Sequence, residues 1–441
     1  MTSRREFLAT GTAALYYGAG RVNDGATGTA QRPVPRASQL VWQQDELALF
    51  LHFGVNTFTD REWGDGREDP GIFNPGSLDA RAWARTARRA GFKAMILTAK
   101  HHDGFCLWPS ATTRHSVASS PWRGGTGDLV REFTDACRAE GLRAGLYLSP
   151  WDRNAAVYGD SPRYNDFYCD QLTELLTRYG PIHEVWFDGA NGEGPNGRRQ
   201  EYDWPRYWGL VRRLQPEAVM FSDAGPDVRW IGNEIGSAGD PNWSTVNPAT
   251  VPVPGMSGDA VMRMLQHGDP HGTAWRPGET DVSIRPGWFH HPAQDEQVRS
   301  VDNMLGLYFT SVGRNSKLLL NVPPTRDGVL HPTDAERLLG LRSRLDRTFE
   351  RDLLPLLRRG RRVRAAIADL REDITSGQRV SRYRVEGLVD GAWRTLSAGQ
   401  TIGYRKLDRF ESVLSTDARV IVEESLGATP RIQLALYEQA E

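Results

Sequence analysis

The sequence predicts an α/β fold: a (β/α)8-like (TIM) barrel followed by a small, truncated C-terminal antiparallel β-sandwich-like module. Nearly continuous apolar runs alternate with helical patterns over the first three quarters of the chain, which is typical of a parallel sheet. Beyond residue 362 the pattern changes to a period of two, as expected for antiparallel strands. The 441 residues accommodate a barrel of about 250 residues or more and a smaller second module.

Four strand-then-helix units open the barrel. Each strand is a near-continuous apolar run, which indicates burial on both faces of a parallel sheet. The first helix begins near Asp79 and ends at Gly91, and the second ends at Gly141, because glycine favours helix ends. The expected strands cover residues 47–54, 94–104, 144–150 and 182–189, and the expected helices cover residues 77–91, 127–140 and 164–179.

The later units are less regular. Residues 237–286 are rich in glycine and proline and show no periodicity, which predicts a long functional loop. The apolar run over residues 317–324 is expected to close the barrel as its last strand. The remaining expected elements are helices over residues 204–214, 294–313 and 333–354 and a strand over residues 218–223.

The catalytic β/α barrel is expected to cover residues 38–355 and the C-terminal β module residues 362–441. Between them, the arginine-rich residues 358–362 could form a nucleic-acid patch or a solvated linker. The net charge of −1 gives no electrostatic support for a nucleic-acid or membrane partner. No run of eighteen apolar residues occurs, so no membrane-spanning helix is expected.

The N-terminus carries the run Ser3-Arg4-Arg5-Glu6-Phe7-Leu8, followed by a weakly apolar stretch. This pattern resembles a twin-arginine export signal, and the alternative is a disordered basic N-terminus. We expect residues 1–30 to be the signal, with cleavage after Ala30, and the mature protein to be periplasmic or secreted.

The three cysteines are widely spaced and form no Cys-x-x-Cys pair, which argues against a zinc knuckle. Cys137 and Cys169 fall on expected helices and are interpreted as thiols of the core. The fourteen tryptophans favour a sugar ligand slightly, because an indole face suits the apolar edge of a sugar ring, although tryptophan also fills cores.

Polar and ionisable side chains collect at the expected strand ends, where barrel enzymes carry out their chemistry. Asp188 follows the buried run Ile182–Phe187 and precedes Gly189, so it would lie at a strand's C-terminal end. Each such residue alone also has a structural interpretation, and their convergence on one barrel face is the specific signal. The candidates are His52, Glu62, Trp63, His101, His102, Tyr147, Trp186, Asp188 and Glu234.

Two chemistries could use this set. Glycoside hydrolysis needs two carboxylates that flank the scissile bond, with histidines and tyrosine on the ring hydroxyls. Metal-assisted hydrolysis would use His52, His101, His102 and Asp188 as ligands, but adjacent histidines in an extended segment point opposite ways. A third, non-enzymatic alternative is a carbohydrate-binding barrel, against which an intact Asp188 and Glu234 count.

Several blocks of the sequence are similar to the α-L-fucosidases of glycoside hydrolase family 29, from about residue 40 to the C-terminus. The most specific are the Lys-His-His-Asp-Gly-Phe and Trp-Phe-Asp-Gly blocks, which occur in family-like order and spacing. The matching segments are Leu51–Gly54, Glu62-Trp63, Leu97–Phe105, Gly145–Ser149, Val185–Gly189 and Leu319–Pro324.

The resemblance implies a retaining exo-hydrolase that needs no metal or cofactor and acts on fucosylated oligosaccharides or glycoconjugates. Asp188 matches the family's nucleophile. The segments Arg229–Glu234 and Ser283–Phe289 are similar to the subgroup that cuts α-1,3 and α-1,4 fucosyl branches, in which the residue matching Glu234 is the acid/base. Fucose-contacting positions match His52, Glu62, Trp63, His101, His102, Tyr147 and Trp186; Trp288 would form a wall of the sugar site, and Arg229 is a further match.

One departure from the family pattern concerns the C-terminal module. Relatives usually carry a first half of the sandwich before the segment that matches Leu370–Val380, which here follows the arginine-rich stretch almost at once. We therefore expect a shortened sandwich, whose unpaired edges would be covered by the barrel or a second subunit.

Overall fold

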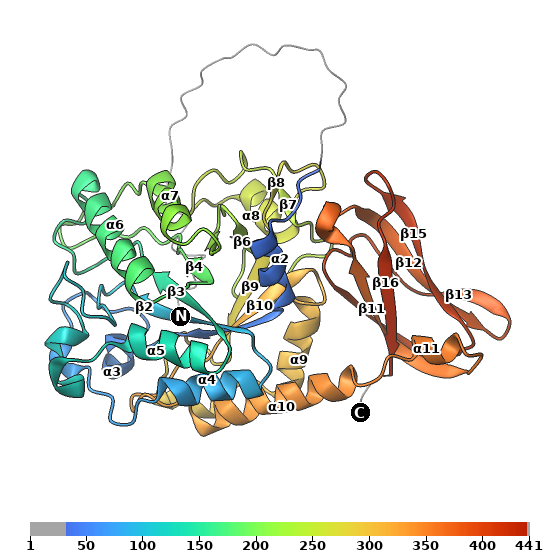
Figure 1. Ribbon diagram of the computed structural model, residues 1–441, viewed down its shortest axis with the longest axis horizontal. Helices are drawn as coiled ribbons and strands as arrows, with labels where there is room; N and C mark the ends of the chain where they lie inside the picture. Colours follow the sequence, from blue (N-terminus) through green and yellow to red (C-terminus); the bar gives the residue numbers. More distant parts are fainter. Residues whose placement is uncertain (1–31, 439–441) are drawn as a thin grey trace, which may run out of the picture.

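The computed structural model describes residues 32–438, and the expected export signal lies outside them. The chain forms a closed parallel barrel with helices around it and, beside the barrel, a C-terminal module of two antiparallel sheets (Figure 1). This arrangement confirms the fold class that the sequence predicts. In the described part of the chain, none of the helices has the length and apolar character that crossing a bilayer requires.

The barrel strands follow the order β1-β10-β9-β6-β5-β4-β3-β2, and each pair of neighbours is parallel. Parallel pairing places all C-terminal strand ends at one end of the barrel. The strands are β1 (Leu47–Leu51), β2 (Ala94–Lys100), β3 (Arg143–Leu148), β4 (Glu184–Trp186), β5 (Val219–Ser222), β6 (Val228–Trp230), β9 (Gly278–Ser283) and β10 (Ser316–Asn321).

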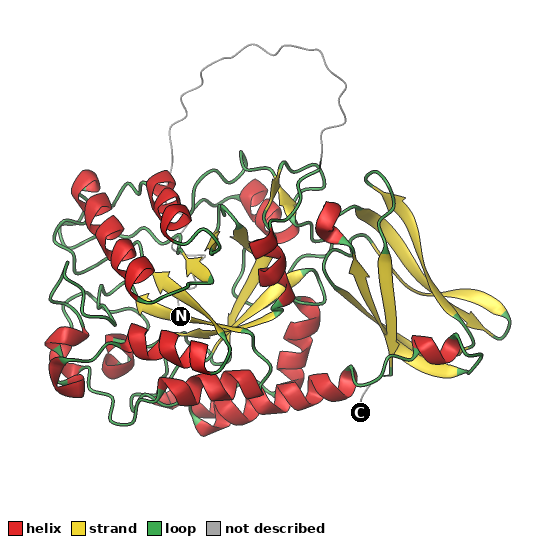
Figure 2. Cartoon of the chain, in the orientation of Figure 1, coloured by secondary structure: helices red, strands yellow, loops and turns green. Residues whose placement is uncertain are grey.

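Helices cover the outside of the barrel (Figure 2). Asp79 caps α4 by accepting from the Ala82 amide, and Asp128 caps α5 in the same way, so these helices begin where the sequence predicts. The larger helices are α4 (Ala80–Arg89), α5 (Leu129–Ala139), α6 (Ser161–Arg178), α7 (Trp204–Leu214), α8 (Asp259–His267), α9 (Val301–Thr310) and α10 (Pro332–Thr348). Shorter helices are α2 (Ala37–Gln44), α3 (Val55–Thr59) and α11 (Leu354–Leu357).

Alternate strand residues face two separate apolar clusters, which explains the continuous apolar runs. The outward residues of β1, Leu47, Leu49 and Leu51, pack under the helices. The inward residues Ala48 and Phe50 pack inside the barrel. Trp42 of α2 joins the inner cluster and donates from Nε1 to Glu184 Oε2 at 2.9 Å. Because Glu184 begins β4, α2 closes the N-terminal end and the site must lie at the other end.

The expectation of a long loop over residues 237–286 is wrong, because this stretch contains α8 and the barrel strand β9. The inward residues of β9 include Glu279 and Asp281, both fully enclosed by the barrel. These polar side chains interrupt the apolar run that identifies a buried parallel strand. The helix expected over residues 294–313 is also divided, into a short 3-10 helix (Pro292–Gln297) and α9.

The C-terminal module contains the sheets β14-β11-β16 and β13-β12-β15, whose pairs are antiparallel as expected. Buried residues of both sheets form one apolar core. Gln378 joins the module to the barrel side, since its Oε1 accepts from the Ser244 amide at 2.7 Å. The strands are β11 (Val363–Glu372), β12 (Val380–Val389), β13 (Ala392–Gly399), β14 (Lys406–Ser415), β15 (Ala418–Ser425) and β16 (Ile432–Tyr437).

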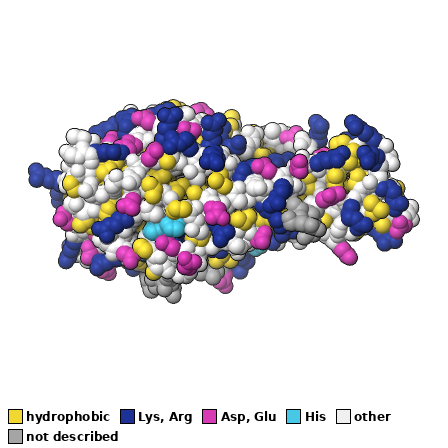
Figure 3. All heavy atoms as spheres, turned by 90° about the horizontal axis from the view of Figure 1, so that it is seen from below, with side chains coloured by type: hydrophobic (Ala, Val, Ile, Leu, Met, Phe, Trp, Pro, Cys, Tyr) yellow, Lys and Arg dark blue, Asp and Glu magenta, His cyan; other side chains and the backbone are white. Residues whose placement is uncertain are grey.

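The surface carries charges of both signs. Figure 3 shows basic and acidic side chains interspersed over the visible face of the barrel. This mixture agrees with the net charge of −1 and gives that face no extended region of a single sign.

Candidate active site

Asp188 lies at the C-terminal end of the barrel, two residues beyond β4, and the residue is 8% exposed. Its Oδ2 accepts a hydrogen bond from Tyr147 Oη at 3.2 Å, and its Oδ1 accepts from the Ala190 amide at 2.8 Å. One donor on each oxygen fixes the plane of the carboxylate. The adjoining Gly189 is required by close packing, because a Cβ there would lie 2.5 Å from Asp223 Oδ2.

His52 follows β1 and is held by a side chain at the end of the neighbouring strand β10. Its Nδ1 lies 2.8 Å from Asn321 Oδ1, while the Asn321 amide nitrogen donates to Ser283 Oγ and the Trp288 carbonyl. This pattern makes His52 Nδ1 the donor and leaves Nε2 as an acceptor. Burial lowers the pKa of His52 to about 4, so the ring is neutral at pH 7.

His101 and His102 lie on the same side of the chain, with ring centroids 4.1 Å apart. The expectation that the two rings point opposite ways is wrong, because β2 ends at Lys100 and the chain turns. The Gly104 amide donates to the His101 carbonyl and closes this turn. Burial, reinforced by the neighbouring histidines, holds the pKa of His101 well below its usual value.

Ser149 orients His102. Ser149 Oγ donates to the Trp151 carbonyl at 2.7 Å, so it accepts from His102 Nδ1, also at 2.7 Å. His102 Nδ1 therefore carries a proton in this hydrogen bond. His101 Nδ1 is buried without a hydrogen-bond partner among residues 32–438.

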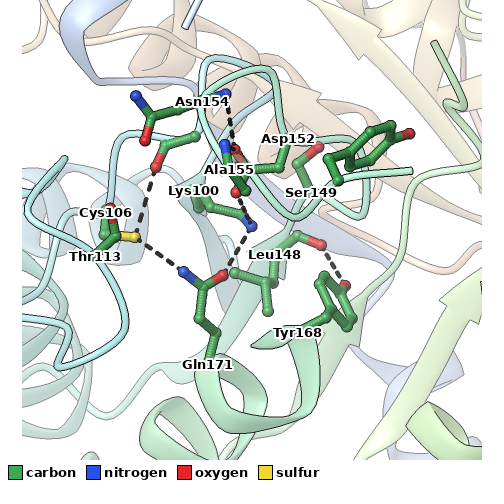
Figure 4. Close-up of polar contacts among 12 residues, drawn as sticks. Lys100, Cys106, Thr113, Leu148, Ser149, Asp152, Asn154, Ala155, Tyr168 and Gln171 are labelled. Atoms are coloured by element: carbon green, nitrogen blue, oxygen red, sulfur yellow. Dashed lines mark hydrogen bonds and ion pairs between the residues drawn. The ribbon is translucent and has the colours of Figure 1, made fainter. Parts of the chain in front are cut away.

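A buried ion pair supports the chain segment that carries these histidines. Figure 4 shows Lys100 between Asp152 and Gln171, at Nζ to oxygen distances of 2.9 and 2.8 Å. Asp152 also accepts from the amides of Asn154 and Ala155. Lys100 therefore links the end of β2 to the loop after β3 and to α6. The three cysteines, including Cys106 beside this pair, are buried free thiols, which confirms the prediction for Cys137 and Cys169.

Trp186 forms part of the inner wall below Asp188. Its ring stacks on Phe221 with centroids 4.1 Å apart and planes 10° apart. Its Nε1 donates to Glu279 Oε1 at 2.9 Å. Burial, together with the nearby Glu184, raises the pKa of Glu279 well above its usual value.

Two further tryptophans come from loops at this end of the barrel. The Trp288 ring lies 5.1 Å from the His52 ring, between centroids. The Trp63 ring packs edge-on against His102 at 6.0 Å. The structure therefore brings the aromatic candidates and all three histidines into one cluster.

Glu62 fastens the loop that carries Trp288. Its Oε2 accepts from the Trp288 amide at 2.9 Å, and its Oε1 accepts from the Phe289 amide at 3.3 Å. His291 Nε2 lies 2.6 Å from the same Oε1. The Glu62 side chain nevertheless remains 32% exposed, so it can also meet a ligand.

Glu234 lies half-buried in the loop after β6. The neighbouring Asn233 fixes this loop by donating to the Ser237 carbonyl and to Gln266 Oε1. Strands β4 and β6 are separated only by β5. The strands that precede Asp188 and Glu234 are therefore two strand spacings of about 4.8 Å apart. Both residues follow strand ends at the same end of the barrel.

The match of Arg229 to a fucose contact is wrong. Arg229 is the middle residue of β6 and points away from the barrel interior, where Val228 and Trp230 pack. Its guanidinium donates to the carbonyls of Leu265 and Arg276 and to Asn242 Oδ1. Arg229 therefore stabilises the surrounding loops and lies outside the site.

The metal-site alternative finds no support in the geometry. Within residues 32–438, no group of three or more histidine, cysteine, aspartate or glutamate side chains is arranged to hold a metal ion. Three residues that hold site side chains are not among those that the sequence predicts: Asn321 holds His52, Ser149 holds His102 and His291 holds Glu62. Asn321 and Ser149 could have been found as polar residues at the ends of apolar strands, whereas His291 gives no such signal.

The closed barrel, with a buried carboxylate, buried histidines and tryptophans at the C-terminal strand ends, has the architecture of a barrel hydrolase. The family model described as "Alpha-L-fucosidase" matches residues 26–348. The chain belongs to the α-L-fucosidase family, glycoside hydrolase family 29, and is a glycoside hydrolase.

Individual relatives agree with this result. "Alpha-L-fucosidase 1" of Arabidopsis thaliana is 41% identical over 92% of this chain and 87% of its own length. A solved glycoside hydrolase 29 family member from an unknown rumen bacterium is 41% identical, with a TM-score of 0.86, over 93% of this chain and 78% of that one. A Ruminococcus gnavus GH29 fucosidase solved in complex with fucose is 30% identical, with a TM-score of 0.83, over 94% of this chain and 98% of that one.

Proposed function

We propose that this α-L-fucosidase is a retaining exo-enzyme that removes terminal α-1,3- or α-1,4-linked L-fucose from branched oligosaccharides or glycoconjugates. The observation that carries the proposal is the placement of Asp188. Its carboxylate is held by Tyr147 Oη and the Ala190 amide, at the barrel end where the three histidines and the tryptophans gather. That arrangement joins a fixed nucleophile to groups that suit a sugar.

In the first step, an oxygen of ionised Asp188 forms a bond to the anomeric carbon of the fucoside. The bond from that carbon to the departing oxygen breaks as Glu234 donates its proton to that oxygen. In the second step, water attacks the same carbon, Glu234 takes up the water's proton, and the bond to Asp188 breaks. Two displacements restore the original anomeric configuration, and Glu234 ends protonated again.

The other candidates would bind the fucose ring. Neutral His52 offers an Nε2 acceptor to a ring hydroxyl, and His101 and His102 would contact further hydroxyls. Trp63, Trp186 and Trp288 would cover the apolar edge of the sugar, while Glu62 would accept from a hydroxyl. The Ruminococcus gnavus relative, solved in complex with fucose, supports this choice of ligand.

Hydrolysis of an aryl α-L-fucoside tests the reaction directly. We expect release of fucose that a chelator does not reduce. Loss of activity on chelation and its return with zinc would instead support a metal enzyme.

A side-by-side panel of α-1,2-, α-1,3-, α-1,4- and α-1,6-fucosylated oligosaccharides tests the linkage. We expect turnover of the α-1,3 and α-1,4 branches, and preference for another linkage would overturn that part of the proposal.

We also propose that residues 1–30 direct export to the periplasm or beyond the cell, as the Arg4-Arg5 pair supports. Replacing both arginines by lysine should leave the enzyme activity in the cytoplasmic fraction. Unchanged export of the double variant would contradict the proposal.

A further inference from the structure

We propose that His291, assisted by Asp60, is a positioning residue that locks Glu62 onto the Trp288 segment and thereby sets the affinity for the sugar. We define the Trp288 segment as residues 287–291. The inference rests on the proposed function, because it assigns Glu62 and Trp288 to fucose binding.

His291 lies between two carboxylates. Its Nε2 is 2.6 Å from Glu62 Oε1, and its Nδ1 is 2.6 Å from Asp60 Oδ1. Ionised carboxylates only accept hydrogen bonds, so imidazole can serve both of them only when both ring nitrogens carry protons. The geometry therefore selects the imidazolium, and the hydrogen bonds to Glu62 and Asp60 raise the pKa of His291.

Glu62 connects His291 to the sugar site, because its carboxylate also bonds the backbone of the Trp288 segment. The oxygen that bonds His291 also accepts from the Phe289 amide, and the other oxygen accepts from the Trp288 amide. The Glu62 carboxylate lies so close to the backbone of Gly287 that a Cβ there would be 2.2 Å from Glu62 Oε1. A small rotation of Glu62 would therefore move both its one remaining acceptor position and the Trp288 segment.

The Trp288 segment has other restraints that do not involve His291. The Gly287 amide donates to Gln294 Oε1, and Asn321 donates to the Trp288 carbonyl. On the other side of the segment, His290 lies 3.2 Å from Asp295, which also binds Arg285. Loss of the His291 bond should therefore loosen Glu62 without unfolding the segment.

The protonation of His291 determines how KM is expected to depend on pH. Asp60 and Glu62, both from the loop after α3, face His291, and His290 on its own segment faces Asp295 instead. Because the pKa of His291 is raised, the two-sided bond is complete at low pH and is lost as pH rises through that pKa. KM should then rise on the alkaline side while kcat changes less.

The test measures kcat and KM for an aryl α-L-fucoside from about pH 5 to pH 9, where histidines titrate. The variants are His291→Gln, which cannot be a cation, and Asp60→Asn, whose side chain is 64% exposed and so should not disturb folding. His271→Gln, at an exposed histidine, is the matched control. Circular dichroism and thermal unfolding of each variant verify that it is folded.

We expect His291→Gln to raise KM about tenfold at low pH and to abolish its alkaline rise, with kcat within about threefold of wild type. Asp60→Asn should move the alkaline rise in KM to lower pH, because it removes one of the two charges that favour the imidazolium. His271→Gln should match wild type.

The inference is overturned if both variants keep the wild-type KM and its pH dependence, or if folded His291→Gln loses kcat with KM unchanged. A failure of the proposed function would look different, since wild-type enzyme would then release no fucose from any substrate of the panel.

Discussion

At the scale of single residues, burial determines which protonation state a site residue such as His52 adopts. His52 is enclosed by the barrel end, and the resulting pKa of about 4 keeps its ring neutral. A neutral histidine can accept from a sugar hydroxyl, whereas an imidazolium can only donate. The same enclosure gives Asp188 its fixed orientation between Tyr147 and Ala190.

His52 should make stability depend on pH. Its folded pKa of about 4 lies below the usual value of 6.5, so the unfolded chain binds more protons between these values. The free energy of unfolding should therefore fall as pH decreases from about 6.5 to 4, by up to about 3 kcal/mol from this group. Urea denaturation at pH 7 and pH 4.5 measures the slope. His52→Asn should show a smaller slope, and an identical slope would contradict the assignment.

Glu234→Ala should lower kcat by about 10²–10⁴-fold, because the variant would remove the proposed proton donor. Azide should restore turnover, since a small anion can attack the fucosyl-enzyme without a general base. Assays on an aryl fucoside with and without azide measure the effect. Full activity of the variant without azide would exclude Glu234 from the acid/base role.

At the scale of elements, the strand ends bring the site together, and the buried Lys100–Asp152 pair holds two of them. Both side chains are essentially inaccessible, at 0% and 2% exposure. The pair joins β2 to the loop after β3, and these two segments carry the histidine pair and the Ser149 support.

Lys100→Met should destabilise the protein by about 3–5 kcal/mol, because Asp152 would keep a buried charge without its cation. The double variant Lys100→Met/Asp152→Asn should recover part of this loss. Urea denaturation of both variants measures the free energies of unfolding. A double variant that is less stable than the single one would contradict the charge-based explanation.

The sequence predicts the apolar strands well and the polar strand β9 poorly. Strands such as β1 are identified because both of their faces pack against apolar clusters. The barrel interior around β9 instead holds Glu279 beside Lys317, its register partner on β10. Identifying the apolar strands also identifies the candidate residues that follow them, because parallel strands place their C-terminal ends together at one end of the barrel. The relation of His101 to His102 is missed, because a turn after Lys100 breaks the strand geometry.

At the scale of the whole molecule, the barrel and the C-terminal module share a polar interface. Gln378 is fully buried there and bonds both the Ser244 amide and the Asn242 carbonyl. Asn242 in turn donates its amide to Thr401 Oγ1 at 3.0 Å. Since Asn242 also accepts from Arg229, the module supports loops that adjoin β6.

Gln378→Ala should lower the free energy of unfolding by about 1–3 kcal/mol, because it leaves the buried Ser244 amide without its acceptor. Its kcat and KM should stay close to wild type, since Gln378 is remote from the strand ends that carry the site. The exposed Gln433→Ala on β16 is the matched control. Equal stability of the two variants, by thermal and urea unfolding, would contradict a stabilising interface.

Covalent trapping tests the central claim most directly. A 2-deoxy-2-fluoro fucosyl fluoride slows the second displacement, so a retaining enzyme accumulates its glycosyl-enzyme. Mass spectrometry of the digested protein should then find one fluorofucosyl group on the peptide that contains Asp188. Labelling of a different residue, or hydrolysis without any covalent adduct and with inverted fucose as the first product, would contradict the account.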